Sequence, residues 1–264
     1  MTEGSPKLHG YRDVAADLRR RIDAGEYPVG LKLPPIRYLA AHYGHAAQTI
    51  RSAISQLAAE GYVIQSRGHE ARVRDRRRVR VPLSRYQDVI SPSGPYGPWE
   101  TACAAQGLDG EMRTFNVERV PAPDDIAATL GVPVGSELVH RQRHALLNGH
   151  PVQIQHAWYP AALVEGTPLA GEDKVVGGVI RALFAAGFAV RPFTERITAA
   201  LPTPEQAAEL QAGAHVPLLR IERVLRDSQG RGLELLRVLA PADQVELVYD
   251  DLPLTMEESP GDER

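Results

Sequence analysis

The chain has 264 residues, and its composition, with 43% hydrophobic and 24% charged residues, excludes wholesale disorder. No run of about 18 apolar residues occurs, which excludes a membrane-spanning helix. The polar N-terminal segment does not have the pattern of a signal peptide. The single cysteine, Cys103, excludes an internal disulfide and a cysteine-rich zinc site. We therefore expect a cytoplasmic protein of one or two domains.

The net charge of −3 conceals an asymmetry between two parts of the chain. Residues 1–80 carry a balance of +7, whereas the remaining residues carry −10. A basic N-terminal part attached to an acidic remainder is typical of a protein that binds a polyanion at one end. Nucleic acid is therefore a candidate partner for the first 80 residues.

The N-terminal part reads as three helices followed by a hairpin. Apolar residues at helical spacing predict helices over residues 11–22, 34–43 and 46–60, with Gly25, Gly44 and Gly61 at their ends. Short apolar runs on either side of a turn predict two paired strands at residues 62–66 and 71–74. Two short helices joined by a tight turn and followed by a hairpin form a winged helix-turn-helix.

Several motifs in this part resemble the DNA-binding domain of GntR-type regulators. Residues 33–40 (LPPIRYLA) resemble the family's Leu-Pro-Ser-Glu-Arg-x-Leu-Ala motif, and residues 49–57 (TIRSAISQL) resemble its recognition helix. Residues 60–63 and 67–68 resemble the segment that leads into the wing and the wing tip. The resemblance covers about residues 8–74.

The resemblance implies a set of DNA contacts. The N-terminal part of a recognition helix enters the major groove, where arginine reads guanine and glutamine reads adenine. Two alanines, Ala46 and Ala47, stand where the family has Ser-Arg, so that one arginine contact is lost and the operator sequence cannot be taken from relatives. The residues expected to contact DNA are Arg37, Gln48, Thr49 and Arg51 in the helices and Arg67, Gly68 and His69 in the wing.

A change of composition marks the end of this domain. Six arginines lie between residues 72 and 80, and a segment rich in proline and glycine follows at residues 82–98. Such a segment is typical of a domain boundary. We therefore divide the chain into a winged helix-turn-helix domain (residues 1–76), a linker (77–95), a second domain (96–254) and an acidic tail (255–264).

The second domain alternates strands with short helices. The pattern predicts helices at residues 123–130, at 179–184 and from 203 onward. It predicts strands at residues 112–120, 138–147, 152–159, 193–201, 218–226, 233–239 and 245–249. Hairpins such as the one around Asn148-Gly149 favour antiparallel pairing. The fold class is therefore α+β, with a largely antiparallel sheet.

This order of elements resembles the UTRA ligand-sensing domain, which defines the HutC subgroup of GntR regulators. The resemblance lies in residues 125–132, in Arg141-Gln142-Arg143, and in residues 149–152, 158–160 and 217–221. The resemblance implies a chorismate-lyase-like fold, a small-molecule effector and a homodimer held by this domain. In relatives the matching Arg-x-Arg binds an acidic or phosphorylated effector.

Arg141 and Arg143 are also candidates on physical grounds. They lie two residues apart on one predicted strand and so share a face with apolar neighbours. An arginine on an apolar face requires an anion or a protein carboxylate as its partner. A tight turn at Asn148-Gly149 would place His156 opposite Arg141, whereas a bulged turn would bring Gln153 and Gln155 onto the arginine face. Both registers remain open.

Other residues complete the expected effector site. Tyr96 lies near the start of a helix, Glu234 matches an acidic residue of the family, and Gly177-Gly178 precede a helix whose backbone N–H groups could face an anion. Sugar-phosphate-binding relatives have Ser-x-Tyr there, so the same amino-sugar phosphate is not expected. The residues expected to contact the effector are Tyr96, Arg141, Arg143, Gln155, His156, Gly177, Gly178 and Glu234.

No catalytic motif stands out, and we expect neither enzyme activity, nor a cofactor, nor a bound metal. The predicted function is that of a sequence-specific regulator, a homodimeric repressor whose binding to double-stranded operator DNA responds to a small anionic effector. Two alternatives remain: a constitutive dimeric regulator without a ligand, and a chorismate-lyase-like enzyme fused to a DNA-binding head.

Overall fold

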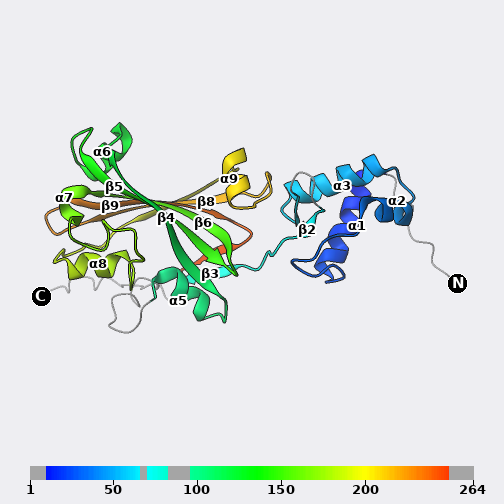
Figure 1. The fold of residues 1–264 in the computed structure, drawn as a ribbon, viewed down its shortest axis with the longest axis horizontal. Coiled ribbons are helices and arrows are strands. Elements are labelled where there is room, and N and C mark those ends of the chain that lie inside the picture. The colour runs from blue at the N-terminus through cyan, green and yellow to red at the C-terminus, as the bar shows by residue number, and fades with distance from the viewer. Residues whose placement is uncertain (1–9, 66–69, 83–95, 250–264) are drawn as a thin grey trace, which may run out of the picture.

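The computed structural model describes residues 10–65, 70–82 and 96–249. These residues form a helical head (residues 10–74) and a larger body built around one sheet (residues 79–249) (Figure 1). In this described part of the chain, no helix is long and apolar enough to cross a membrane.

The head contains the expected three helices and a short hairpin. Apolar residues at helical spacing pack inward around Leu18, Leu39 and Leu57, which are fully buried. Gly44 ends the second helix with a positive φ of 66°, a conformation that glycine adopts without strain. The elements are α1 (Tyr11–Asp23), α2 (Ile36–Tyr43), α3 (Ala47–Ala59), β1 (Val63–Ile64) and β2 (Arg72–Val73), and β1 and β2 pair antiparallel.

The body is an antiparallel sheet of six strands in the order β4-β5-β6-β9-β8-β7. The α+β architecture and the antiparallel sheet predicted from the sequence are confirmed. The strands are β4 (Gly110–Pro121), β5 (Glu137–Leu147), β6 (His150–Pro160), β7 (Glu195–Ala200), β8 (Leu218–Arg226) and β9 (Gly232–Pro241).

Helices cover both faces of this sheet. One face packs against α5 and α8, and the other packs against α6 and α9 (Figure 1). The face with α5 and α8 carries the largest apolar cluster, which includes Tyr159 and Leu183. The helices are α5 (Pro98–Ala104), α6 (Asp124–Leu130), α7 (Ala161–Val164), α8 (Val179–Ala185) and α9 (Pro204–Glu209).

A separate pair of strands joins the two parts of the chain. The strand β3 (Val79–Pro82) pairs in parallel with β10 (Val245–Val248), with Val81 opposite Leu247. The beginning of the expected 77–95 linker is therefore a strand bound to the body, which the sequence analysis did not predict. The rest of that linker lies outside the described residues.

The register between β5 and β6 is the bulged one. Leu147 pairs with His150 across the Asn148-Gly149 turn, but a bulge follows, so that Arg143 pairs with Gln155. Directly opposed residues of an antiparallel pair point to the same face. Gln155 therefore shares the face of the two arginines, and His156, which pairs with Gln142, lies on the opposite face.

The head contacts the body directly. The Gly213 backbone lies against the end of α3, where a Cβ atom at position 213 would come within 2.3 Å of the Ala59 carbonyl oxygen. The His215 N–H donates to that same carbonyl at 2.8 Å. The helix expected to read DNA is thus attached to the domain expected to sense a ligand.

Candidate functional site

The exposed face of α3 is the candidate DNA-reading surface. Ile50 and Ile54 turn into the head core, which leaves Gln48 and Arg51 exposed on the outer face. Arg37 is also exposed, in the first turn of α2. Within the described part of the chain, the side chains of Gln48, Arg51 and Arg37 have no hydrogen-bond or ion-pair partner, so all three remain available to DNA.

The remaining predicted DNA contacts differ in their surroundings. Thr49 is half-buried, and Arg67, Gly68 and His69 lie outside the described residues. No side chain caps α3 at Ala46, so the positive end of the helix stays open to a phosphate beside Gln48. The sequence analysis missed Ser55, which is exposed one turn after Arg51 and which helical spacing could have identified.

A partly open cavity of about 110 Å³ lies in the body between the sheet and helices α5 and α8. Its wall also includes Val81 of β3 and Leu247 of β10. A concave, mostly apolar site with a few convergent polar groups is the usual form of a small-molecule site. The charged and amide side chains in the wall are Glu100, Arg141, Arg143, Gln153, Gln155, Lys174, Glu195 and Arg223.

Arg141 lines the cavity, but its guanidinium group is already occupied. The side chain is 0% exposed, and burial lowers its pKa. The guanidinium group donates hydrogen bonds to several backbone carbonyls of the loop that connects α7 to α8 and so holds this loop in place. The acceptors are the carbonyl oxygens of Pro168 (3.3 Å), Leu169 (3.2 Å), Gly171 and Asp173 (2.9 Å), together with Thr114 Oγ1 (3.2 Å).

Arg143 lines the same cavity, but its guanidinium group is not occupied by hydrogen bonds to the described residues. Its side chain is only 7% exposed, yet it has no hydrogen bond or ion pair with any described residue. Its Nε atom is buried without a partner, like that of Arg141, but unlike Arg141 its terminal nitrogen atoms also have no partner among the described residues. A buried charge that lacks a partner is costly, and such groups concentrate where a ligand supplies the partner. Arg143 is therefore the strongest candidate for direct contact with an anion.

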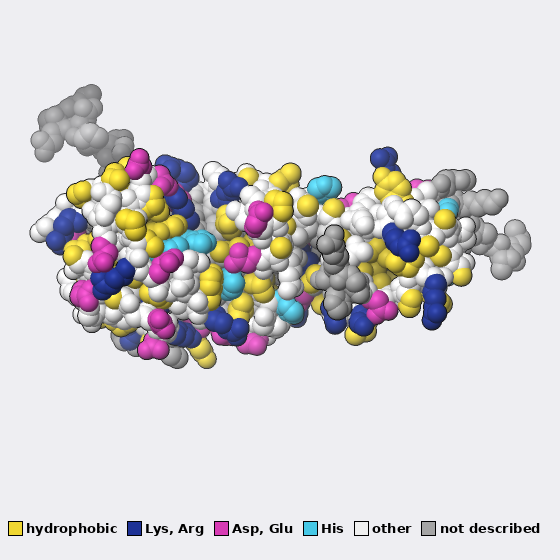
Figure 2. Space-filling view, turned by 45° about the horizontal axis from the view of Figure 1, so that its top comes forward, with side chains coloured by type: hydrophobic (Ala, Val, Ile, Leu, Met, Phe, Trp, Pro, Cys, Tyr) yellow, Lys and Arg dark blue, Asp and Glu magenta, His cyan; other side chains and the backbone are white. Residues whose placement is uncertain are grey.

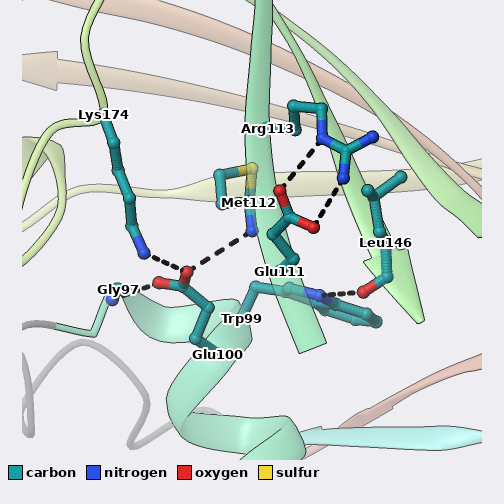
Figure 3. A network of polar contacts seen from close by, with 8 residues as sticks. All are labelled: Gly97, Trp99, Glu100, Glu111, Met112, Arg113, Leu146 and Lys174. Carbon is teal, nitrogen blue, oxygen red and sulfur yellow. Dashed lines mark hydrogen bonds and ion pairs between the residues drawn. The ribbon is translucent and has the colours of Figure 1, made fainter. Parts of the chain in front are cut away.

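The polar groups at the α5 side of the cavity are paired with one another (Figure 3). Glu100 accepts from Lys174 Nζ at 2.5 Å and from the Gly97 N–H at 3.0 Å. The Met112 N–H lies 3.4 Å from the same carboxylate, and the Trp99 indole donates to the Leu146 carbonyl at 3.0 Å. The sequence analysis did not select Glu100 or Lys174, because they converge only in the fold.

Glu234 does not line the cavity but supports it. The side chain is 0% exposed and accepts from Arg223 Nη2 at 2.5 Å and from the Tyr159 hydroxyl at 2.8 Å. Burial, followed by the charge of Glu234, raises the pKa of Tyr159 and keeps its hydroxyl protonated as a donor. Arg223, which the sequence analysis missed, reaches the cavity because it lies two residues after Ile221 on β8 and so points to the same face.

The other predicted effector residues divide into two groups. Gln155 and Gly178 line the cavity, and Gln155 Nε2 donates to Gln153 Oε1 at 2.8 Å. Tyr96 and Gly177 do not line it. The Gly178 N–H donates to the Val175 carbonyl at 3.1 Å, so it is not free for an anion as the sequence analysis expected.

His156 lies outside the cavity, because the bulge in the hairpin turns it to the other face. There its Nδ1 lies 3.1 Å from His140 Nε2, and both rings stack with Trp158. Figure 2 shows histidine side chains on the visible face of the body, beside hydrophobic ones. Within the described residues, no three His, Cys, Asp or Glu side chains are placed to hold a metal ion.

The cavity and the head are connected through one pair of strands. Val81 and Leu247, which lie in the cavity wall, pair with each other in β3 and β10. Just before these strands, Gln244 accepts from Arg74 Nη2 at 2.6 Å and donates to the Asp75 carbonyl at 2.8 Å. A displacement of this cavity wall would therefore act on the residues that hold the head.

Comparison with known proteins agrees with this division of the chain. The family described as bacterial regulatory proteins, gntR family, matches residues 10–73, and the UTRA domain family matches residues 105–246. An uncharacterized HTH-type transcriptional regulator of Rhizobium meliloti is 30% identical over 244 residues, which cover 90% of this chain and 93% of the relative.

A solved relative shares both parts. The HTH-type transcriptional repressor PhnF of Mycolicibacterium smegmatis is 26% identical over 246 residues, which cover 93% of this chain and 94% of PhnF. The crystal structure of PhnF superposes with a TM-score of 0.54 and covers 93% of this chain and all of that chain. The chain therefore belongs to the gntR family of bacterial regulatory proteins, with a UTRA domain as its body, and it is a DNA-binding transcriptional regulator rather than an enzyme.

Proposed function

We propose that the protein is a repressor that binds operator DNA as a homodimer and is released when a small anion occupies the body cavity. The observation that carries this proposal is Arg143, a cation that is buried in the cavity wall without a partner. Relatives named as transcriptional repressors, PhnF and a probable fructoselysine utilization operon repressor of Escherichia coli, support repression as the outcome.

The surface of the head supports the DNA contacts. Gln48 and Arg51 project from the first turns of α3, and Arg37 projects from α2. Figure 2 shows basic side chains on the visible face of the head, with acidic ones among them. In this proposal Arg51 reads a guanine, Gln48 reads a neighbouring base or a phosphate, and Arg37 contacts the backbone.

A homodimer follows from the way such heads read DNA. One winged helix-turn-helix reads a half-site of a few base pairs, and specific operators join two half-sites by symmetry. The body, which the resemblance to the UTRA domain assigns to dimerisation, would hold the two heads at a fixed spacing. Effector binding would change that spacing, provided that the effector prefers the arrangement that does not fit the operator.

The strands β3 and β10 supply the physical route for this response. An anion that pairs with Arg143 would fill a cavity whose wall includes Val81 and Leu247. These two residues lie on the strands that lead directly to Arg74 and Gln244, where the head is held. A small displacement at the cavity would therefore move the attachment point of the head.

Fluorescence anisotropy with labelled DNA from upstream of the protein's own gene tests the proposal. We expect wild-type protein to bind in a salt-dependent manner and to be released by a small-molecule fraction of the cell extract. Arg51→Ala should weaken DNA binding about 10-fold or more, because one bidentate base contact contributes about 1–3 kcal/mol. Arg113→Ala removes the same charge from the body, where Arg113 pairs only with Glu111, and serves as the control.

A substitution of Arg143 tests the response to the ligand separately from DNA binding. Arg143→Gln should keep DNA binding and lose release by the active fraction. If Arg143→Gln is released as readily as wild type, the cavity is not the effector site. If Arg51→Ala binds as tightly as wild type, the assignment of α3 as the reading helix is wrong.

A further inference from the structure

We propose that the ligand of the cavity is a monocarboxylate with a hydrocarbon body, such as a medium-chain fatty acid or a phenyl-substituted alkanoic acid, and not a phosphorylated sugar. This inference rests on the proposed function, since it specifies the anion that Arg143 receives. Three properties of the wall lead to it: its charge, its apolar surface and its scarcity of free hydrogen-bonding groups.

The charges of the wall leave a place for one small anion. Lys174 pairs with Glu100, Arg223 pairs with Glu234, and Glu195 adds a further carboxylate to the wall. The guanidinium group of Arg141 donates to the 168–173 loop and to Thr114. Among the described residues, Arg143 is the wall cation that keeps its donors unused. Arginine pairs bidentately with carboxylate and with phosphate, but one guanidinium group balances the whole charge of a carboxylate and only half that of a phosphate dianion.

Half of the residues in the wall have apolar side chains. They come from five strands, from α5 and α8 and from the segment before α8, and their hydrocarbon groups do not bond to a sugar hydroxyl. Contact with these side chains removes apolar ligand surface from water, which favours a ligand with a hydrocarbon body. The apolar side chains of the wall are Val81, Pro98, Trp99, Met112, Val175, Val179, Ile180, Ile221, Leu236, Val238 and Leu247.

Few hydrogen-bonding groups remain for a polyhydroxylated ligand. Gln153 and Gln155 bond to each other, which leaves part of each amide to assist a carboxylate beside Arg143. The Gly178 N–H is used by the Val175 carbonyl, and α8 begins with Val179, which has no hydroxyl group. The hydroxyl groups of a sugar would therefore recover only part of the hydrogen bonds that they make to water.

The volume of the cavity fits a small hydrocarbon body, and because the cavity is partly open, a longer body can extend through its mouth. A space of about 110 Å³ is of the order of one benzene ring. Hexanoate and 3-phenylpropanoate are therefore suitable probes. Their neutral counterparts, hexanamide and 3-phenylpropanamide, have nearly the same shape but lack the charge that Arg143 would pair.

Binding to the full chain is measured by isothermal titration calorimetry and by tryptophan fluorescence. The chain has two tryptophans, and Trp99 lies in the cavity wall while Trp158 lies on the other face of the sheet. In a Trp158→Phe background the emission therefore reports on the cavity alone. We expect one or both carboxylates to bind and to shift this emission, and each amide to bind at least 10-fold more weakly.

Variants and sugar phosphates complete the experiment. Arg143→Gln should weaken carboxylate binding at least 10-fold, Arg143→Lys should restore part of it, and Arg113→Gln should leave it unchanged. Glucose 6-phosphate and glucosamine 6-phosphate should not bind. Because Arg143 has no hydrogen-bond or ion-pair partner among the described residues, its variants are expected to fold, and circular dichroism verifies this.

The outcomes separate this inference from the proposed function. Binding of a sugar phosphate that depends on Arg143, without binding of the carboxylates, overturns the ligand class but leaves an anion-responsive repressor. Carboxylate binding that depends on Arg143 but does not release operator DNA supports the ligand class and overturns the proposed regulation. Carboxylate binding that Arg143→Gln does not weaken, or binding of no probe at all, overturns the inference.

Discussion

Arg74, at the end of the wing strand, donates to Asp243 of the body at 2.5 Å, and its side chain is only 3% exposed. The second Nη atom of Arg74 donates to Gln244 at 2.6 Å. Arg76, two residues later, stacks over Tyr62 of the head with 3.9 Å between its Cζ atom and the ring centroid. The orientation of the DNA-binding head is thus set by a small number of directed contacts.

Removal of the Arg74 guanidinium group should loosen the head from the body. Arg74→Met retains the apolar stem but leaves Asp243 and Gln244 without their donor. Since hydrogen bonds to charged groups contribute about 1.5–3 kcal/mol, we expect the free energy of unfolding to fall by about that amount. Small-angle scattering should show a larger radius of gyration than wild type. Arg77→Met, at an exposed position that pairs only with Asp75, is the control.

Gly213 gives a second test of the same interface. An alanine Cβ at this position would lie 2.3 Å from the Ala59 carbonyl oxygen and 2.5 Å from the Gly61 nitrogen, and neither backbone atom can move alone. We expect Gly213→Ala to separate the body from the end of α3 and to change operator affinity in the anisotropy assay. Gly171→Ala, whose Cβ would have no atom closer than 3.9 Å, should behave as wild type.

An unchanged operator affinity and an unchanged scattering profile for Gly213→Ala would show that this contact does not set the position of the head. If the affinity changes while the ligand still releases the DNA to the same extent, the head is coupled to the cavity through β3 and β10 alone. The two variants, Arg74→Met and Gly213→Ala, therefore probe separate parts of one interface.

Local patterns predicted most of the elements but not the contacts between distant segments. Helical periodicity and the two-residue alternation of strands are properties of short windows, and they placed α3 and the β5–β6 hairpin correctly. The strand β3 was missed because it exists by pairing with β10, more than 160 residues away, in an arginine-rich segment that resembles a linker.

In the candidate site, too, local sequence patterns predicted the positions of residues on a strand but not their contacts with distant segments. Alternation along β5 predicted that Arg141 and Arg143 share a face, and the structure confirms it. No local pattern indicates that the 168–173 loop reaches Arg141 and not Arg143, so the sequence could not distinguish their roles. The bulge after Ala145 likewise depends on how the whole hairpin packs, and it decided between Gln155 and His156.

The two arginines should respond in opposite ways to the same substitution. Arg141→Met removes the donors that hold the 168–173 loop and leaves buried carbonyl groups without partners, which should lower the free energy of unfolding by about 2–4 kcal/mol. Arg143→Met replaces an unpartnered buried cation with an apolar side chain, so stability without ligand should stay equal or rise by about 1–2 kcal/mol. Urea unfolding measures both.

Equal destabilisation by the two substitutions would contradict this assignment, because it would mean that Arg143 also has a structural partner. The pair of variants further separates stability from response. Arg143→Met should fold and bind DNA yet fail to respond to the ligand, whereas any loss of response in Arg141→Met should accompany its loss of stability.

The histidine pair on the other face of the sheet predicts a sensitivity to acid. Burial, followed by the charge of neighbouring His140, lowers the pKa of His156 below its usual value of 6.5. The unfolded chain therefore takes up a proton at this residue before the folded chain does. The stabilising contribution of neutral His156 is present above about pH 6.5 and is lost as the pH falls through the lowered pKa of the folded state.

Urea unfolding between pH 7.5 and pH 5 measures this contribution. One additional proton bound by the unfolded state makes the free energy of unfolding fall by at most about 1.4 kcal/mol per pH unit. His156→Gln should flatten the slope toward acid pH, because glutamine does not titrate. His150→Gln, at the exposed hairpin turn, should leave the wild-type slope. A slope that His156→Gln does not change would place the acid sensitivity elsewhere in the chain.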